Sequence, residues 1–131
     1  GTAGEEWSAM GKHVLVIEDE PNIIEAIRFI LHRDGWRVDT HSDGATAVAA
    51  VRAQRPDIVI LDVMLPGRSG FDILRELRTQ AELESLPVLM LTARGAAKDR
   101  ETAERAGVSR FMTKPFSNAE VLAAVREMAG P

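Results

Sequence analysis

The sequence predicts an α/β protein, a single doubly wound domain in which a five-stranded parallel sheet carries five helices on its two faces. Short, continuous apolar runs such as residues 14–17 and 58–61 are typical of strands buried on both faces of a parallel sheet. These runs alternate with segments whose apolar residues recur at helical spacing. The length of 131 residues suits one domain with a real core and is too short for two.

The predicted strands follow one another from residue 12 onward. The first 11 residues show no periodicity, and we expect them to be a tail or a cloning remnant ahead of a domain that spans residues 12–129. Strands are expected at residues 14–17, 36–41, 57–61, 87–92 and 110–113. The second of these alternates apolar and polar side chains, which is typical of a strand at a sheet edge.

A helix is expected after each strand. Pro21 suits the first position of the first helix, because its missing N–H has no cost there. Ser42-Asp43 and Asn118 are candidate caps of the second and fifth helices, and Ser69-Gly70 opens the third. One face of the first helix is apolar: Ile23, Ile24, Ile27, Ile30 and Leu31. The fourth helix, over residues 96–106, has only alanines as apolar members, so we expect it to be weakly held and free to shift.

The composition narrows the classes of function. A formal net charge of −4 gives no indication of nucleic-acid binding by bulk electrostatics. No apolar run approaches the ~20 residues of a membrane span, and no signal peptide is visible. The chain has no cysteine, which excludes disulfides and thiolate metal sites. We therefore expect a cytoplasmic protein that contacts neither membrane nor nucleic acid directly.

Carboxylates stand at the ends of two predicted strands. Asp62 directly follows the apolar run at residues 58–61, and Glu18 and Asp19 follow the run at residues 14–17. If these strands are neighbours, the acids meet beyond the carboxyl ends of the sheet, where open α/β sheets bind their ligands. The negative charges of such a cluster repel one another unless a cation neutralises them. A hard cation that prefers oxygen ligands, Mg²⁺ above all, is the expected one.

Two further polar residues stand at the ends of the fourth and fifth predicted strands. Thr92 closes the fourth strand and Lys114 the fifth. The whole set matches what transfer of a phosphoryl group onto Asp62 requires: a carboxylate nucleophile, acids that hold Mg²⁺, and a lysine that pairs with a phosphoryl oxygen. Each residue also has a structural alternative, since Asp62 could cap the following helix and Thr92 could simply pack at a strand end.

Four motifs resemble the receiver domain of bacterial response regulators, in the right order and over residues 12 to about 129. They are Val-Leu-Val-Ile-Glu-Asp-Glu-Pro, Asp-Ile-Val-Ile-Leu-Asp-Val-Met-Leu-Pro-Gly, Leu-Thr-Ala-Arg and Phe-Met-Thr-Lys-Pro-Phe. The resemblance implies a flavodoxin-like sheet with the strand order 2-1-3-4-5. It also implies a histidine kinase or phosphotransfer protein as the phosphoryl donor, and no enzymatic activity beyond the domain's own phosphorylation and dephosphorylation.

The resemblance assigns a role to each residue of the site. Asp62 would be the phosphoacceptor, Thr92 and Lys114 would contact the phosphoryl group, and the Lys114–Pro115 bond would be cis. Thr92 and Phe111 would form the switch, although Phe111 could equally be a plain core residue. The implied Mg²⁺ ligands are Glu18 (through water), Asp19, Asp62 and the main-chain carbonyl of Met64. Met64 and Arg94 would flank the path of an attacking water, and we expect slow autodephosphorylation.

The first helix is also the expected docking site of the kinase. Opposite its apolar face lies a patch that begins next to the acidic residues and consists of Asn22, Ala26 and Phe29, with Ile23 at its edge. The output that this domain would control is not written in the sequence. A homodimer formed on phosphorylation is a further expectation, but Ser109 and Arg110 stand where receivers with the common dimer carry acidic residues, and this disfavours that dimer.

Three other functions fit less well. A phosphatase resembling the haloacid dehalogenase family would need a second aspartate two residues after the nucleophile, where this chain has Met64. A flavin-binding module would need a phosphate-binding loop where the acidic triplet of residues 18–20 stands. A dinucleotide-binding fold would need a Gly-x-Gly-x-x-Gly turn, which is missing.

Overall fold

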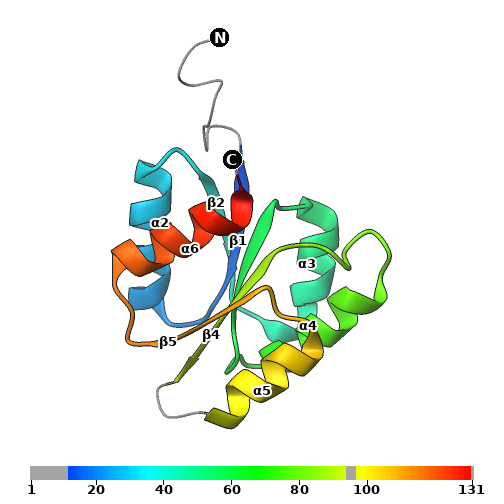
Figure 1. Cartoon of the computed structure of the whole chain (residues 1–131). Coiled ribbons are helices and arrows are strands. Elements are labelled where there is room, and N and C mark those ends of the chain that lie inside the picture. The colour runs from blue at the N-terminus through cyan, green and yellow to red at the C-terminus, as the bar shows by residue number, and fades with distance from the viewer. Residues whose placement is uncertain (1–11, 94–96, 131) are drawn as a thin grey trace.

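The computed structural model describes residues 12–93 and 97–130, which form a five-stranded parallel sheet between two layers of helices (Figure 1). In chain order the elements are β1 (His13–Ile17), α2 (Pro21–Arg33), β2 (Arg37–His41), the 3₁₀ turn η1 (Gly44–Thr46), α3 (Ala47–Gln54), β3 (Ile58–Asp62), α4 (Gly70–Thr79), β4 (Val88–Ala93), α5 (Ala97–Ala106), β5 (Arg110–Lys114) and α6 (Asn118–Ala129). The strand order is β2-β1-β3-β4-β5, and all pairs are parallel, which confirms the predicted doubly wound fold.

The two faces of the sheet carry separate cores. Alternate residues of a strand point to opposite faces, so Leu15 and Ile17 pack with α3, α4 and α5, while Val14 and Val16 pack with α2 and α6. Figure 1 shows the same division, with α2 and α6 on one side of the sheet and the other three helices on the opposite side. The strands β1, β3 and β4 are buried on both faces, as their continuous apolar runs predict.

The helix ends differ from the predicted ones at two places. Asp43 caps the short turn η1 by accepting a hydrogen bond from the N–H of Ala45 at 2.9 Å, and α3 begins only afterwards. At α6 the N-cap is Ser117 rather than Asn118, because Ser117 and Glu120 form a reciprocal capping box. Ser69 caps α4 as expected, accepting from the N–H of Asp72 at 3.2 Å.

Other features agree with the sequence, apart from small shifts of the strand ends. The strand β2 lies at the edge of the sheet and begins at Arg37 rather than Trp36, whose side chain is buried. The Lys114–Pro115 peptide is cis. Among the described helices, none combines the length and the apolar character needed to cross a bilayer. The expected tail at residues 1–11 lies outside the described residues.

Candidate functional site

The candidate site lies at the carboxyl edge of the sheet, where β1, β3 and β5 end. Asp62 is the last residue of β3, Glu18 directly follows β1, and Lys114 is the last residue of β5. The loop behind Asp62 is tightly packed, because a Cβ on Gly70, the first residue of α4, would lie 2.2 Å from the Asp62 carbonyl oxygen. Only glycine allows this close approach, which fixes the backbone behind the aspartate.

Three carboxylates gather at this edge. One oxygen each from Glu18, Glu20 and Asp62 lies within 4.8 Å of the other two. Glu18 and Asp62 are buried, whereas Glu20 is exposed. Buried carboxylates are costly unless they are paired or bound to a cation, so this cluster has to be neutralised.

Glu18 is held by the backbone on one side only. Its Oε2 accepts hydrogen bonds from the N–H groups of Asp19 at 3.0 Å and Glu20 at 3.2 Å. Its Oε1 is buried and makes no hydrogen bond, although the Lys114 ammonium lies 3.2 Å away. Burial, together with the adjoining carboxyl group of Asp62, raises the pKa of Glu18 from 4.5 to about 7.

Lys114 supplies the positive charge of the cluster. Its Nζ lies 3.2 Å from Glu18 Oε1, 3.2 Å from Glu20 Oε1 and 3.3 Å from Asp62 Oδ1. Burial by itself would lower the pKa of Lys114, but the charges of Asp62 and Glu18 outweigh burial and the pKa is raised. The ammonium is therefore kept charged beside the buried carboxylates.

The residues present fit a hard divalent cation. All candidate ligand atoms are oxygens, and the buried Oε1 of Glu18 makes no hydrogen bond among the described residues. The cluster includes Glu20, which the sequence analysis did not assign, and Asp19 is exposed with its carboxylate outside the cluster. The assignment of Asp19 as a Mg²⁺ ligand therefore stays a prediction. The acidic triplet at residues 18–20 indicates the cluster, but not which two of its three acids lie close to Asp62.

The predicted switch residues lie at neighbouring strands. Thr92 is buried near the end of β4, and its hydroxyl donates a hydrogen bond to Asp99 Oδ2 on α5 at 2.6 Å. Phe111 is half-buried on β5, with the guanidinium of Arg100 lying 5.2 Å from the centre of its ring. Sequence reasoning found neither Asp99 nor Arg100, because both belong to a helix with a charged, unpatterned surface.

The other predicted residues are less closely tied to the cluster. The Met64 side chain is 75% exposed, and Arg94 lies outside the described residues. The expected docking patch is divided between two hollows. Asn22, Ile23 and Ala26 line one of about 590 Å³ together with Lys114 and Phe116. Phe29, which is 59% exposed, lines a separate hollow of about 540 Å³ beside Val38 of the edge strand β2.

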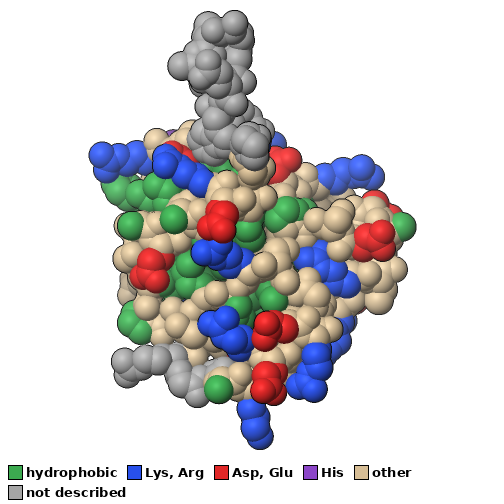
Figure 2. Space-filling view, in the orientation of Figure 1, with side chains coloured by type: hydrophobic (Ala, Val, Ile, Leu, Met, Phe, Trp, Pro, Cys, Tyr) green, Lys and Arg blue, Asp and Glu red, His purple; other side chains and the backbone are tan. Residues whose placement is uncertain are grey.

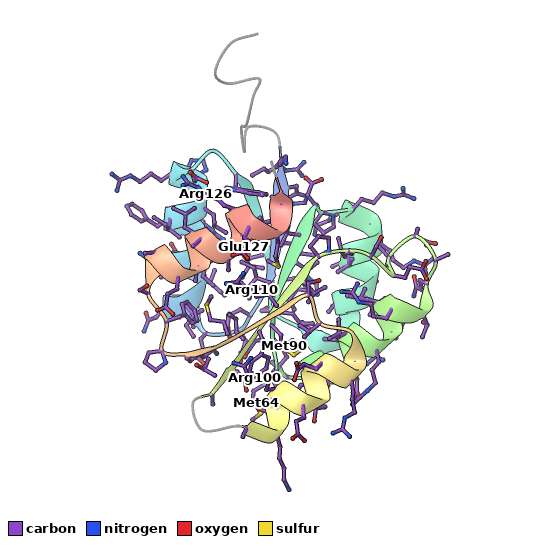
Figure 3. All side chains as sticks on the ribbon, viewed as in Figure 1. Met64, Met90, Arg100, Arg110, Arg126 and Glu127 are labelled. Carbon is purple, nitrogen blue, oxygen red and sulfur yellow. The ribbon has the colours of Figure 1, made fainter. Side chains whose placement is uncertain are left out.

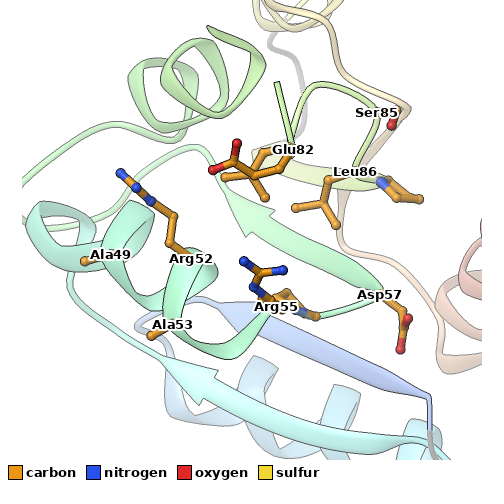
Figure 4. A pocket seen from close by; sticks show the side chains of 11 residues that line it. Ala49, Arg52, Ala53, Arg55, Asp57, Glu82, Ser85 and Leu86 are labelled. Atoms are coloured by element: carbon orange, nitrogen blue, oxygen red, sulfur yellow. The ribbon is translucent and has the colours of Figure 1, made fainter. Parts of the chain in front are cut away.

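A further hollow lies away from this site. It measures about 770 Å³ and lies between the end of α3 and the segment before β4, with Arg52, Arg55 and Leu86 in its wall (Figure 4). Asp57, which also lines it, stands at the opposite end of β3 from Asp62, and its carboxylate accepts a hydrogen bond from the His13 N–H at 2.7 Å. This hollow therefore contains none of the residues of the carboxylate cluster.

Several known proteins resemble this chain in sequence, and solved structures resemble it in fold. "Probable transcriptional regulatory protein TcrX" of Mycobacterium tuberculosis is 48% identical over 115 residues, which are 88% of this chain and 48% of that protein. PhoP of Bacillus subtilis, an alkaline phosphatase synthesis transcriptional regulatory protein, is 39% identical over 117 residues, which are 89% of this chain and 48% of that protein. The chain thus spans about half the length of these curated relatives.

A solved structure and a family model agree with these relatives. The receiver domain of the sensor histidine kinase PA1611 from Pseudomonas aeruginosa PAO1, with a magnesium ion coordinated in its active-site cleft, superposes with a TM-score of 0.84. It is 33% identical, and the match covers 92% of this chain and 99% of that one. The family model of the response regulator receiver domain matches residues 14–126. This chain therefore belongs to the response regulator receiver domain family of two-component signalling.

Proposed function

We propose that this domain is a phosphorylation-controlled switch that accepts a phosphoryl group on Asp62 from a histidine kinase or phosphotransfer protein, with Mg²⁺ as cofactor. The observation that carries the proposal is the position of the buried Asp62 carboxylate, 3.3 Å from the Lys114 ammonium and beside two other acids. A strand-end carboxylate, a fixed cation and a set of oxygen ligands are what phosphoryl transfer needs from a protein.

In the proposed reaction an Asp62 carboxylate oxygen attacks the phosphorus atom of the donor. The bond from phosphorus to the donor's imidazole nitrogen, or to the acyl oxygen of acetyl phosphate, breaks, and the electron pair leaves with the donor. Lys114 pairs with a phosphoryl oxygen. Bound Mg²⁺ would neutralise the phosphoryl oxygens, and the residues proposed to hold it are Glu18, Asp19, Asp62 and the main-chain carbonyl of Met64, with Glu20 as a further candidate. The domain would catalyse only its own phosphorylation and dephosphorylation.

Asp62 is a better nucleophile candidate than Glu18. Backbone N–H groups engage one oxygen of Glu18, and such hydrogen bonds make that carboxylate a weaker nucleophile. We therefore assign Glu18 to the cation and Asp62 to the phosphoryl group.

Labelling with acetyl phosphate tests this assignment. Intact-mass spectrometry should show one added phosphoryl group on the wild type with Mg²⁺ and none with EDTA. Asp62→Asn should abolish labelling. Asp57→Asn is the matched control, since Asp57 lies at the other end of β3 and asparagine can still accept the hydrogen bond from His13. Equal labelling of the wild type and Asp62→Asn would refute the proposal.

We further propose that phosphorylation acts through Thr92 and Phe111 on the surface formed by α5, β5 and α6. This surface carries acidic and basic side chains next to one another (Figure 2). Arg110 of β5 is paired with Glu127 of α6 at 2.6 Å, so a homodimer through this surface would have to form around an ion pair that is already made. The relatives named above are transcriptional regulatory proteins. We propose that this domain likewise controls transcription, in the cytoplasm.

For the donor, we propose docking along α2. Asn22, Ile23 and Ala26 line the hollow that also contains Lys114, so a helix bound there would lie beside the phosphorylation site. Phe29, which lines the separate hollow beside the edge strand β2, is included in the proposed docking surface as its outer part. Phe29→Glu should slow transfer from a phosphorylated cognate kinase and leave labelling by acetyl phosphate unchanged. Unchanged transfer kinetics would exclude Phe29 from the docking surface.

A further inference from the structure

We infer that Asp99 is a positioning residue that holds the Thr92 hydroxyl away from the phosphorylation site, so that phosphorylation of Asp62 has to release the first turn of α5. This inference rests on the proposed function of Asp62. The contact that carries it is the hydrogen bond from Thr92 Oγ1 to Asp99 Oδ2, which is 2.6 Å long. Bonds this short are typical of a hydroxyl that donates to a carboxylate.

The hydroxyl of Thr92 can serve only one acceptor at a time. A hydroxyl has a single proton to donate, and here that proton is directed to Asp99. Thr92 is 1% exposed, so water has little access to replace either partner. If Thr92 donates to a phosphoryl oxygen on Asp62, the carboxylate of Asp99 must lose its bond. The two states of this hydroxyl are therefore mutually exclusive.

Asp99 and its neighbour contact both of the predicted switch residues. Asp99 lies in the first turn of α5 and binds Thr92, and the next residue, Arg100, covers the ring of Phe111 at 5.2 Å. The rest of α5 adds little apolar contact, because its buried residues are Ala103 and Ala106. The hydrogen bond of Asp99 is therefore one of the main contacts that hold the first turn of α5. When this bond is lost and the turn moves, Arg100 moves with it and its contact with Phe111 changes.

This arrangement predicts a domain that resists phosphorylation in its resting state. Breaking a hydrogen bond to a charged group is unfavourable, and that free energy opposes every state in which Thr92 turns toward Asp62. Removing Asp99 should therefore favour the phosphorylated arrangement. The competing explanation is that Asp99 only stabilises the amino-terminal turn of α5 through the helix dipole. That effect would not depend on Thr92, and this difference separates the two explanations.

Hydrogen exchange of the unphosphorylated protein is the first measurement, and it does not depend on the proposed function. Asp99→Ala should speed exchange in α5 about tenfold relative to wild type, and should add no acceleration in a Thr92→Val background. Glu101→Ala is the matched control, because it removes an exposed acid from the same helix. Asp99→Asn keeps the size and one acceptor oxygen, so it should change exchange in the same direction by a smaller factor.

Labelling by acetyl phosphate with Mg²⁺ is the second measurement. Asp99→Ala should raise the labelling rate several-fold over wild type, Glu101→Ala should not, and Thr92→Val should be slower and insensitive to Asp99→Ala. Equal effects of Asp99→Ala in both backgrounds, in either measurement, would overturn the inference in favour of the helix dipole, and no effect at all would also overturn it. A wild type that takes no label would refute the proposed function instead, and the exchange measurement would then decide on the Thr92–Asp99 contact alone.

Discussion

The helices α5 and α6 flank the same strand, β5, but they are held to the sheet in different ways. On one face, α6 buries Val121, Ala124 and Val125 against the sheet. On the other face, α5 buries only Ala103 and Ala106. Burial of a branched side chain stabilises by about 2 kcal/mol, whereas a single methyl group contributes less than about 1 kcal/mol.

Polar contacts increase the difference between these helices. On α6, Arg110–Glu127 joins the helix to β5 and Arg126 pairs with Asp34, just after α2 (Figure 3). Neither contact involves a residue of the carboxylate cluster or a predicted switch residue. On α5, the contacts of Asp99 and Arg100 are made with Thr92 and Phe111, at the site itself. The comparison indicates that the position of α6 is fixed by its packing on the sheet. The position of α5 depends on the contacts of Asp99 and Arg100 with the switch residues.

The largest expected effect comes from removing apolar contact on α6. Val125→Ala should lower the free energy of unfolding by about 2 kcal/mol, because it deletes two buried methyl groups and leaves a small cavity. The matched change on α5, Ala103→Gly, should cost about 1 kcal/mol, mainly from helix propensity. Urea unfolding followed by circular dichroism measures both. Equal losses, or a larger loss on α5, would contradict the comparison.

A smaller effect should appear as a dependence of stability on pH. Hydrogen bonds and the charge of Arg126 lower the pKa of Asp34 below its ordinary 3.8. A lowered pKa means that the stabilisation is present above pH 3.8 and is lost as the pH falls through the folded value. Arg126 is 51% exposed, so screening by water limits the effect to about 1 kcal/mol or less.

Asp34→Asn provides the check on this pH dependence. At neutral pH the variant should have a lower free energy of unfolding than wild type. In acid, where Asp34 of the wild type is protonated, the two free energies of unfolding should become equal. Urea unfolding at several pH values between neutral and strongly acidic would show the two curves approaching one another. Parallel curves would mean that the pair with Arg126 does not help to hold α6.

The smallest expected effect is on the cation–π contact of α5. Arg100→Ala should cost about 0.5 kcal/mol, because cation–π pairs at exposed positions are weak. A double-mutant cycle with Phe111→Leu isolates the pair from other roles of each residue. A coupling near zero would leave Asp99 as the main side-chain contact between the first turn of α5 and the switch residues.

The fold could be predicted almost completely from the sequence. Continuous apolar runs such as residues 58–61 indicate burial on both faces, and their alternation with helical segments predicts a parallel sheet with helices on both sides. The same local logic found Asp62, since a carboxylate at the end of such a run has to lie at the carboxyl edge. The strand order came from the resemblance to receiver domains. The sequence also predicted the weak packing of α5, because a helix without large apolar residues has little surface to bury.

Side-chain partners at this edge were decided only by the tertiary structure. The acidic triplet showed that carboxylates gather there, but Glu20 rather than Asp19 joins Glu18 and Asp62, and Thr92 turns to Asp99. Likewise, Ser117 rather than Asn118 caps α6, and Phe29 faces a different hollow from Ala26. Sequence periodicity reports which face of an element is buried, whereas the rotamer of each polar side chain depends on charges and hydrogen-bonding groups that the fold brings from distant parts of the chain.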